Sequence, residues 1–274
     1  MKTLKWMTGM VLGTGLLLVS CTSTDEELNQ PSETGQGQLT FSLSSGTTFA
    51  ADATRAVSEA SYKNVDNYTV IVTDKDGVEK LNCKGFEVAS NMPLTLPIGS
   101  FTVKAFYGTE SAASRDDFYV LGITEGTIKG AKQEEVAVTC TPTCGRLKVA
   151  FDEDMATYFD NYEVTFTGTE ALGANTISWL KDDTEPWYVT LNKSGEILTF
   201  TVTTTTKDAY LNSDNKEKVS TKNGSFTLSR NHAYKLNIKP NYTPTAMGNI
   251  EIDITIDETT NDKPVDIEVP IEWL

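Results

Sequence analysis

Histidine is almost absent from this chain of 274 residues, in which His232 is the single copy. A Ser/His/Asp or Cys/His catalytic arrangement would have to use that imidazole, and its position inside an apparent strand favours a structural role. A structural zinc site takes four ligands, mostly Cys and His, and neither an HExxH sequence nor a P-loop occurs. The sequence therefore predicts a protein that is not an enzyme and that holds no metal or other cofactor.

Basic residues are also scarce, since Lys and Arg number 23 against 38 Asp and Glu, which gives a formal net charge of −15. Nucleic acids and anionic lipid head groups are bound by basic patches, so the composition argues against both as partners. The many acidic side chains are those expected of a solvated surface, and their abundance does not indicate a catalytic pair of carboxylates.

Hydrophobic runs long enough to span a bilayer are lacking as well. The most apolar run, Trp6 to Val19, follows Lys2 and Lys5 and is shorter than the roughly 20 residues that a membrane-spanning helix needs. It has the pattern of a signal peptide, and it ends in Leu18-Val19-Ser20-Cys21, which resembles the lipobox of bacterial lipoproteins. We therefore expect residues 1–20 to be removed and Cys21 to carry the lipid anchor. The alternative is an ordinary secretory signal with a chance cysteine.

The residues just after Cys21 favour exposure on the cell surface. Asp25-Glu26-Glu27 resembles the export signal of Bacteroidetes-type surface lipoproteins, which places them on the outside of the outer membrane. The rest of residues 21–37 is rich in Gly, Ser, Thr and Gln, as in a flexible tether. The expected location is thus the outer membrane, lipid-anchored and exposed at the cell surface, with the periplasmic leaflet as the alternative.

Cysteine is limited to three residues beyond Cys21, namely Cys83, Cys140 and Cys144, an odd number for an oxidising compartment. Cys140 and Cys144 flank a Thr-Pro-Thr segment. They are candidates for a disulfide across a tight loop, and the equal alternative is that both are buried thiols at strand ends. The pairing among the three cysteines stays open.

Strand patterns are abundant, whereas a helical period is confined to one short turn at Glu153 to Phe159. Leu39 to Ser45 alternates apolar and polar residues, as a half-buried strand does. Asp74-Lys75-Asp76-Gly77 predicts a hairpin turn, because Asp and Gly tolerate positive φ angles. Further short strands are expected at Phe118–Gly122 and Thr127–Ile128. The sequence therefore predicts an all-β protein.

The second half of the chain repeats the plan of the first. The segment Asp66-Asn67-Tyr68-Thr69-Val70-Ile71-Val72 recurs as Asp160-Asn161-Tyr162-Glu163-Val164-Thr165-Phe166, and similar strand patterns follow both copies, although so short an identity alone is compatible with chance. We expect two tandem antiparallel β-sandwich domains after the signal and the tether, with the boundaries 1–20, 21–37, 38–142 and 143–274.

Two runs near the C-terminus alternate strongly, namely Ile250 to Ile256 and Val265 to Trp273, with apolar residues at every second position and mostly acidic residues between them. A strand with this pattern buries its apolar face against something. Each run is therefore either the last strand of its own sheet or a strand that is offered to a neighbouring molecule.

Several motifs together resemble a known family. They are Asp-Asn-Tyr-x-Val with its following turn, Leu-Pro-Ile-Gly-Ser-Phe-Thr-Val-Lys-Ala, Asp-Phe-Tyr-x-x-Gly, Val-Ala-Val-Thr-Cys and Arg-Asn-His-Ala-Tyr. With these motifs, which cover most of the mature chain, the sequence resembles a Bacteroidetes lipoprotein family of unknown function related to the fimbrillins. The resemblance implies transthyretin-like or fimbrillin-like sandwiches and a structural or adhesive role.

Fimbrillins are pilus subunits, so the resemblance also implies a way of assembly by donor-strand exchange. In that family a surface protease cuts after an arginine in the loop behind the first strand, that strand leaves, and a neighbour's terminal strand fills the groove. Here the loop carries Arg55, which is a candidate cleavage site or an ordinary basic loop residue. The partners implied are the outer membrane through the lipid anchor, and other fimbrial subunits or further copies of this chain.

A second hypothesis is a glycan-binding surface lipoprotein of an outer-membrane nutrient-uptake system, with a polysaccharide as its partner. Trp179, Trp187 and Tyr188 are candidates for an aromatic platform that stacks on a sugar ring, although such residues also serve as core packing. The sequence leaves the ligand or receptor open.

Overall fold

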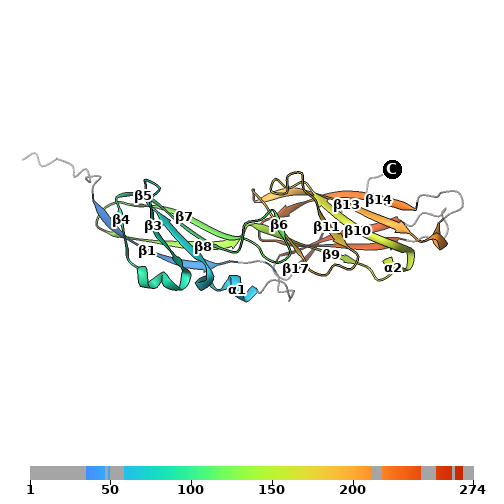
Figure 1. Ribbon diagram of the computed structural model, residues 1–274, viewed down its shortest axis with the longest axis horizontal. Helices are drawn as coiled ribbons and strands as arrows, with labels where there is room; N and C mark the ends of the chain where they lie inside the picture. Colours follow the sequence, from blue (N-terminus) through green and yellow to red (C-terminus); the bar gives the residue numbers. More distant parts are fainter. Residues whose placement is uncertain are drawn as a thin grey trace, which may run out of the picture. The chain divides into compact units, whose positions relative to one another are not determined.

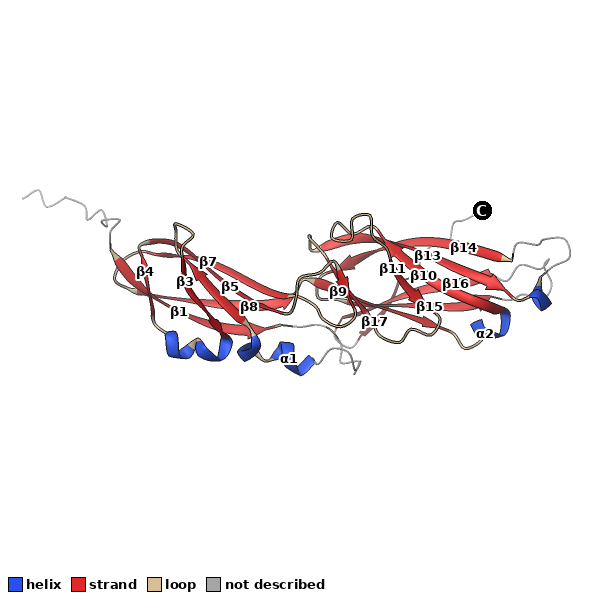
Figure 2. Cartoon of the chain, viewed as in Figure 1, coloured by secondary structure: helices blue, strands red, loops and turns tan. Residues whose placement is uncertain are grey.

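The computed structural model describes residues 35–46, 49, 59–211, 218–241, 251–260 and 263–267. The expected signal peptide, Cys21 and Arg55 lie outside these residues. Residues 33–274 make one compact unit by their contacts, so the division into two independent domains at residue 142 stays a prediction. Strands dominate the described part of the chain, and the helices are single turns (Figure 2).

The first half of the chain forms a seven-stranded sheet in the order β3-β2-β5-β7-β8-β1-β4 (Figure 1). Its strands are β1 (Gln36–Ser45), β2 (Thr69–Thr73), β3 (Glu79–Lys84), β4 (Leu94–Pro97), β5 (Gly99–Tyr107), β7 (Val120–Ile128) and β8 (Gln133–Pro142). Short helical turns join them, namely α1 (Glu59–Lys63), η1 (Val65–Asn67), η2 (Gly85–Glu87) and η3 (Ala89–Asn91). The inward side chains of β2 and β5 share one hydrophobic cluster with those of β1 and β8, so the sheet folds over onto itself as a sandwich.

The second half contains a four-stranded and a six-stranded sheet that enclose a second cluster. The four-stranded order is β11 (Ile177–Leu180), β10 (Phe159–Thr167), β13 (Gly195–Thr206) and β14 (Val219–Ser229). The six-stranded order is β17 (Lys263–Ile267), β16 (Glu251–Thr260), β15 (Ala233–Asn241), β9 (Cys144–Phe151), β12 (Trp187–Thr190) and β6 (Ala113–Ser114). The helical turns here are α2 (Met155–Tyr158) and η4 (Asp208–Tyr210). The prediction of an all-β sandwich fold is confirmed.

The pairing plan of the first half occurs again in the second. β1 pairs in parallel with β8 and antiparallel with β4, and β9 pairs in parallel with β15 and antiparallel with β12. Likewise β2 lies between β3 and β5, as β10 lies between β11 and β13. The repeated segments that begin at Asp66 and Asp160 therefore occupy equivalent strands, each with a buried tyrosine, Tyr68 or Tyr162.

The predicted hairpin turn at Asp74 is confirmed in atomic detail. The Asp74 carboxylate accepts hydrogen bonds from the backbone N–H groups of Asp76 (3.0 Å) and Val78 (2.9 Å). Gly77 has φ +73, a conformation that favours glycine because it has no Cβ. Asp74 and Gly77 thus form the turn that connects β2 to β3.

Three local predictions need correction. The two short strands expected at Phe118–Gly122 and Thr127–Ile128 are one strand, β7, because its pairing with β5 runs without a break. His232 precedes β15 rather than lying inside a strand. The expected helix is shortened to α2. Asp154 occupies its N-cap position without a side-chain capping hydrogen bond, and the Asp152 carboxylate accepts the backbone N–H of Asp154 at 2.9 Å.

The alternating C-terminal runs have separate roles. β16 pairs with β15 from Glu251 to Thr259 and buries Ile252, Ile254 and Ile256 in the second cluster, so the first run is the last core strand of its own sheet. β17 pairs with β16 at the edge of the sheet, and residues 268–274 lie outside the described part.

We expect Phe166→Ala to lower the free energy of unfolding by about 3–5 kcal/mol, because it leaves a cavity in the core. Phe166 is fully buried and packs against Phe200 at a ring-centroid distance of 6.4 Å. The matched control is Thr165→Val on the same strand, whose side chain points outward and should change stability by less than about 0.5 kcal/mol. Chemical denaturation followed by tryptophan fluorescence measures both, and equal effects would contradict the assigned strand orientation.

Candidate functional site

Strand β1, the expected removable strand, lies between β8 and β4. It pairs with β8 in parallel from Gln38 opposite Gln133 to Ser45 opposite Cys140. It pairs with β4 only from Gln36 to Leu39. Beyond Leu39, the ladder partner of β1 within the described residues is therefore β8 alone.

The inward side chains of β1 complete the first hydrophobic cluster. Leu39 is fully buried, Phe41 is 7% exposed, and Leu43 packs at the margin of the cluster. Fully burying a side chain of this kind stabilises a fold by about 1.5–3 kcal/mol. Loss of β1 would consequently uncover a long apolar groove beside β8.

A groove of about 420 Å³ already lies along the free edge of β1. It is lined mainly by apolar side chains of β1, of the helical turn before β2 and of the segment after β3, namely Phe41, Leu43, Val65, Val88, Ala89 and Met92, together with Thr40 and Gly85. The groove beside β1 is thus mainly apolar.

The chain that follows β1 is fixed at Phe49. This side chain is buried, and its ring lies 5.8 Å from that of Phe118 and 6.0 Å from that of Tyr188. The guanidinium of Arg146 lies 5.6 Å from the centroid of the same ring. Phe49 therefore fixes the chain shortly after the end of β1, and cleavage after Arg55 stays a prediction.

The three aromatic residues proposed as a sugar platform do not form one. Trp179 is fully buried in the second cluster, whereas Tyr188 is 5% exposed, belongs to the first cluster and stacks on Phe118 at 4.7 Å. Trp187 is half-buried. The platform is therefore wrong, because two of its three rings are core packing and adjacent residues of β12 point to opposite faces.

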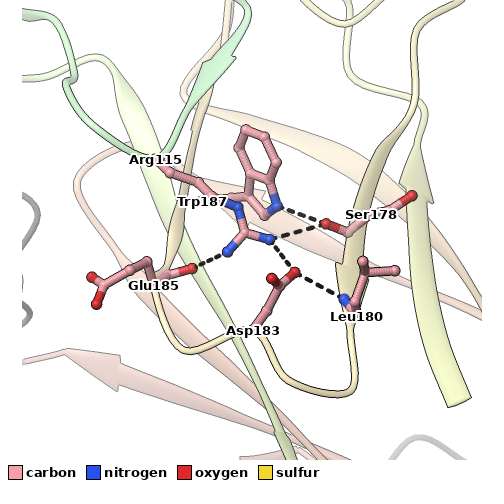
Figure 3. A network of polar contacts seen from close by, with 6 residues as sticks. All are labelled: Arg115, Ser178, Leu180, Asp183, Glu185 and Trp187. Atoms are coloured by element: carbon pink, nitrogen blue, oxygen red, sulfur yellow. Dashed lines mark hydrogen bonds and ion pairs between the residues drawn. The ribbon is translucent and has the colours of Figure 1, made fainter.

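Trp187 and Trp179 instead hold an arginine that the sequence analysis missed, and Figure 3 shows this residue, Arg115, beside Trp187. The guanidinium carbon of Arg115 lies 4.5 Å from the Trp187 ring centroid and 5.0 Å from the Trp179 ring centroid. Arg115 Nη1 donates to the carbonyl of Glu185 (2.6 Å), and Nη2 donates to the Asp183 carboxylate (2.5 Å). Cation–π contacts and charge-assisted hydrogen bonds of this type fix a side chain firmly.

Further hydrogen bonds tie the same cluster together. Trp187 Nε1 donates to the carbonyl of Ser178 (3.0 Å), which also accepts from Arg115 Nη2 (3.1 Å). The Asp183 carboxylate in turn accepts the backbone N–H of Leu180 (2.8 Å). These hydrogen bonds make the cluster a structural clasp between the loop of β6 and strands β11 and β12, although the buried Trp179 Nε1 and Glu185 Oε2 have no hydrogen-bond partner in the described residues.

Cys140 and Cys144 stand at the end of β8 and the start of β9, both buried and both free thiols. Burial raises the pKa of Cys140 to about 11 and also raises the pKa of Cys144. The structure thus matches the alternative of buried strand-end thiols and gives no support to the predicted disulfide. Cys83 is also free and half-buried.

Neither a membrane-spanning helix nor a metal-binding cluster occurs in the part of the chain that the structure describes. Within the described residues, no helix has the length and apolar character needed to cross a bilayer. The same part of the chain holds no cluster of three or more His, Cys, Asp or Glu side chains arranged for a metal ion.

We expect alkylation of the native protein at neutral pH to modify Cys83 first and to leave Cys140 and Cys144 protected until the protein unfolds. The reason is that a thiol reacts as the thiolate, and burial raises the pKa of Cys140 to about 11. Peptide mapping by mass spectrometry without reductant measures the order of labelling. A Cys140–Cys144 cross-linked peptide would contradict the prediction.

We expect Arg115→Lys to cost about 1–3 kcal/mol of the free energy of unfolding, because lysine cannot reproduce the planar fork of hydrogen bonds. The control is Lys129→Ala in the exposed turn after β7, which should be nearly neutral. Urea unfolding curves of both variants test this, and a neutral Arg115→Lys would show that the clasp contributes little.

Several solved structures are similar to this chain over most of its length. A fimbrial assembly protein from Parabacteroides distasonis is 11% identical, with a TM-score of 0.41, over 85% of this chain and 99% of that chain. A fimbrilin from Porphyromonas gingivalis is 10% identical, with a TM-score of 0.41, over 83% and 98% of the respective chains. The fimbrial anchor protein Mfa2 from the same species is 12% identical, with a TM-score of 0.40, over 84% and 99%. At these scores the likeness supports no conclusion about function.

None of the curated proteins matches the chain. The family described as "Domain of unknown function (DUF4493)", in contrast, matches residues 35–271, which include every strand that the structure describes. The expectation of a family of unknown function is therefore confirmed, and the chain belongs to the DUF4493 family.

Proposed function

We propose that this chain is a lipid-anchored protein of the outer cell surface with a structural or adhesive role, and that it assembles by exchange of β1 for a terminal strand of another subunit. The observation that carries the proposal is the way in which β1 is held. It contributes a backbone ladder to β8 and two buried apolar side chains, Leu39 and Phe41. Any strand with the same alternation satisfies these requirements, because strand addition relies mainly on main-chain hydrogen bonds.

The covalent link explains why cleavage would be needed. While β1 is part of the chain, it competes for its groove at an effective concentration on the order of millimolar. A cut after Arg55 would turn β1 into a separate segment that can dissociate. Because Cys21 precedes β1 in the sequence, the same cut would separate the subunit from its lipid anchor, so anchoring and assembly would be alternative states of one chain.

The donor strand proposed is the segment that begins with β17. β17 pairs only with β16 in the described structure, from Lys263 opposite Thr260 to Ile267 opposite Ile256. Its release would leave Ile252, Ile254 and Ile256 of β16 in the second cluster. The sequence from Val265 to Trp273 places apolar residues at alternate positions, with Asp266, Glu268, Pro270 and Glu272 between them, and a strand that fills an apolar groove requires such a pattern.

We expect a chain of residues 56–274, which lacks β1, to form soluble oligomers that the same chain without residues 264–274 does not form. Size-exclusion chromatography with light scattering measures the assembly. A synthetic peptide of residues 36–45 should block it by refilling the groove. The matched control is the same peptide with Leu39→Asp and Phe41→Asp, which keeps the backbone but loses both buried side chains. Oligomers that form equally well without residues 264–274 would contradict the proposed donor.

A further inference from the structure

The outer face of the four-stranded sheet is unusual for a chain of this composition. Its outward side chains, here called the hydroxyl face, are mainly Thr, Ser and Asn. Glu163 is the charged residue of its central rows, and the exposed apolar residues Leu180, Ile197 and Val219 lie at its margins. The whole chain is 22% charged, and soluble surfaces usually intersperse charges of both signs. A large uncharged polar sheet face on a strongly acidic protein therefore calls for an explanation.

The register of the strands arranges these side chains in rows across the sheet. The central row follows from the pairing of Thr165 with Ser178 and Thr201, and of Thr201 with Asn223. The Thr201 hydroxyl donates to the side-chain carbonyl of Asn223 at 2.7 Å, so these two side chains lie on the same face. The neighbouring rows are Thr167–Thr199–Ser225 and Leu180–Glu163–Thr203–Thr221, so one end of the second row is apolar.

The equivalent face of the first half provides an internal comparison. There the counterpart of the central row is Asn82–Ile71–Lys104–Ile123, and the next row is Lys84–Thr69–Phe106–Leu121. The same sheet position thus carries charged and apolar side chains in one copy of the pairing plan and hydroxyl groups in the other. The β-fold alone therefore does not require a hydroxyl face.

We propose that the hydroxyl face binds an uncharged polysaccharide. The net charge of −15 repels anionic chains, and the face offers neither the basic groups that nucleic acids need nor a continuous apolar area for a protein partner. Hydroxyl and amide groups both donate and accept hydrogen bonds, as the hydroxyl groups of a sugar chain do. The ligand is thus a neutral polymer that repeats hydroxyl groups.

The geometry favours a polymer over a single sugar. Outward side chains lie about 4.8 Å apart across neighbouring strands and about 6.7 Å apart along one strand, and the β-branched threonine has few rotamers to lose on binding. Each exposed hydrogen bond contributes only about 0.5–1.5 kcal/mol. Useful affinity therefore requires many simultaneous contacts, and affinity should rise with the length of the saccharide.

This inference rests on the proposed adhesive role, for which the hydroxyl face names the class of ligand. The face does not depend on strand exchange, because a monomer would also carry it. It also replaces the aromatic platform that the sequence suggested, since Trp179 and Tyr188 are buried. A chain that never polymerises would still bind through this face.

The test is native affinity electrophoresis of the full chain, purified in mild detergent, in gels that contain dextran, mannan, a mixed-linkage β-glucan or galactan, with alginate as the anionic comparison. We expect at least one neutral polysaccharide, and not alginate, to retard the parent protein. Thr201→Lys, which copies the Lys104 of the first half, should weaken that retardation at least ten-fold in apparent dissociation constant. Thr201→Ser should retain most of it.

The matched control is Thr102→Lys, which places the same charge on the outer face of the first half beside Glu125 and should leave retardation unchanged. Equal melting temperatures of the variants exclude unfolding as the cause. The proposal is overturned if no neutral polysaccharide retards the parent, if alginate retards it equally, or if Thr201→Lys and Thr102→Lys behave alike. A parent that self-associates through this face, and that Thr201→Lys makes monomeric, would overturn it in favour of a second copy as the occupant.

Discussion

A parallel pair of strands that are far apart in the sequence closes each half of this molecule, and the remaining strands are arranged around it. β1 pairs with β8, and β9 pairs with β15. In both halves the two paired strands are therefore separated in the sequence by several other strands. The closure of such a long loop is costly in entropy, and the buried side chains of Leu39 and Phe41 help to offset it. Because main-chain hydrogen bonds supply much of the contact, the pairing specifies a strand with an alternating pattern rather than one particular sequence.

β1 therefore has two proposed roles. In the anchored chain β1 completes the core, and its segment connects the sandwich to Cys21. After a cut at Arg55 the same strand would be the part that leaves, and an apolar groove beside β8 would drive assembly because open sheet edges and exposed apolar surface are unfavourable. The hydroxyl face is separate from this process, since its rows lie on β10, β11, β13 and β14 and include neither β1 nor the proposed donor strand β17. Assembly and ligand binding would thus use different strands.

Local patterns predicted much of the fold, whereas contacts between distant segments were not predictable. The Asp74 turn, the strand of Leu39 to Ser45 and the internal repeat follow from residue preferences over a few positions, and each is present. Arg115 lies 68 positions before Asp183, and no sequence pattern marks the two as partners. Similarly, the sequence around Trp179 and Tyr188 does not state which face of a strand is covered, and both rings are buried. The hydroxyl face also required the strand register, because its rows join residues of four separate strands.

The measurement that tests the central claim most directly is the N-terminus of the protein on its native cell. Protein extracted from the cell surface would be run unboiled beside boiled on a denaturing gel, with the N-terminus of each band determined by mass spectrometry. Strand exchange predicts a ladder that collapses on boiling and a mature chain that begins at Ala56. A single band whose chain still begins with acylated Cys21 would contradict strand exchange and would establish an anchored monomer.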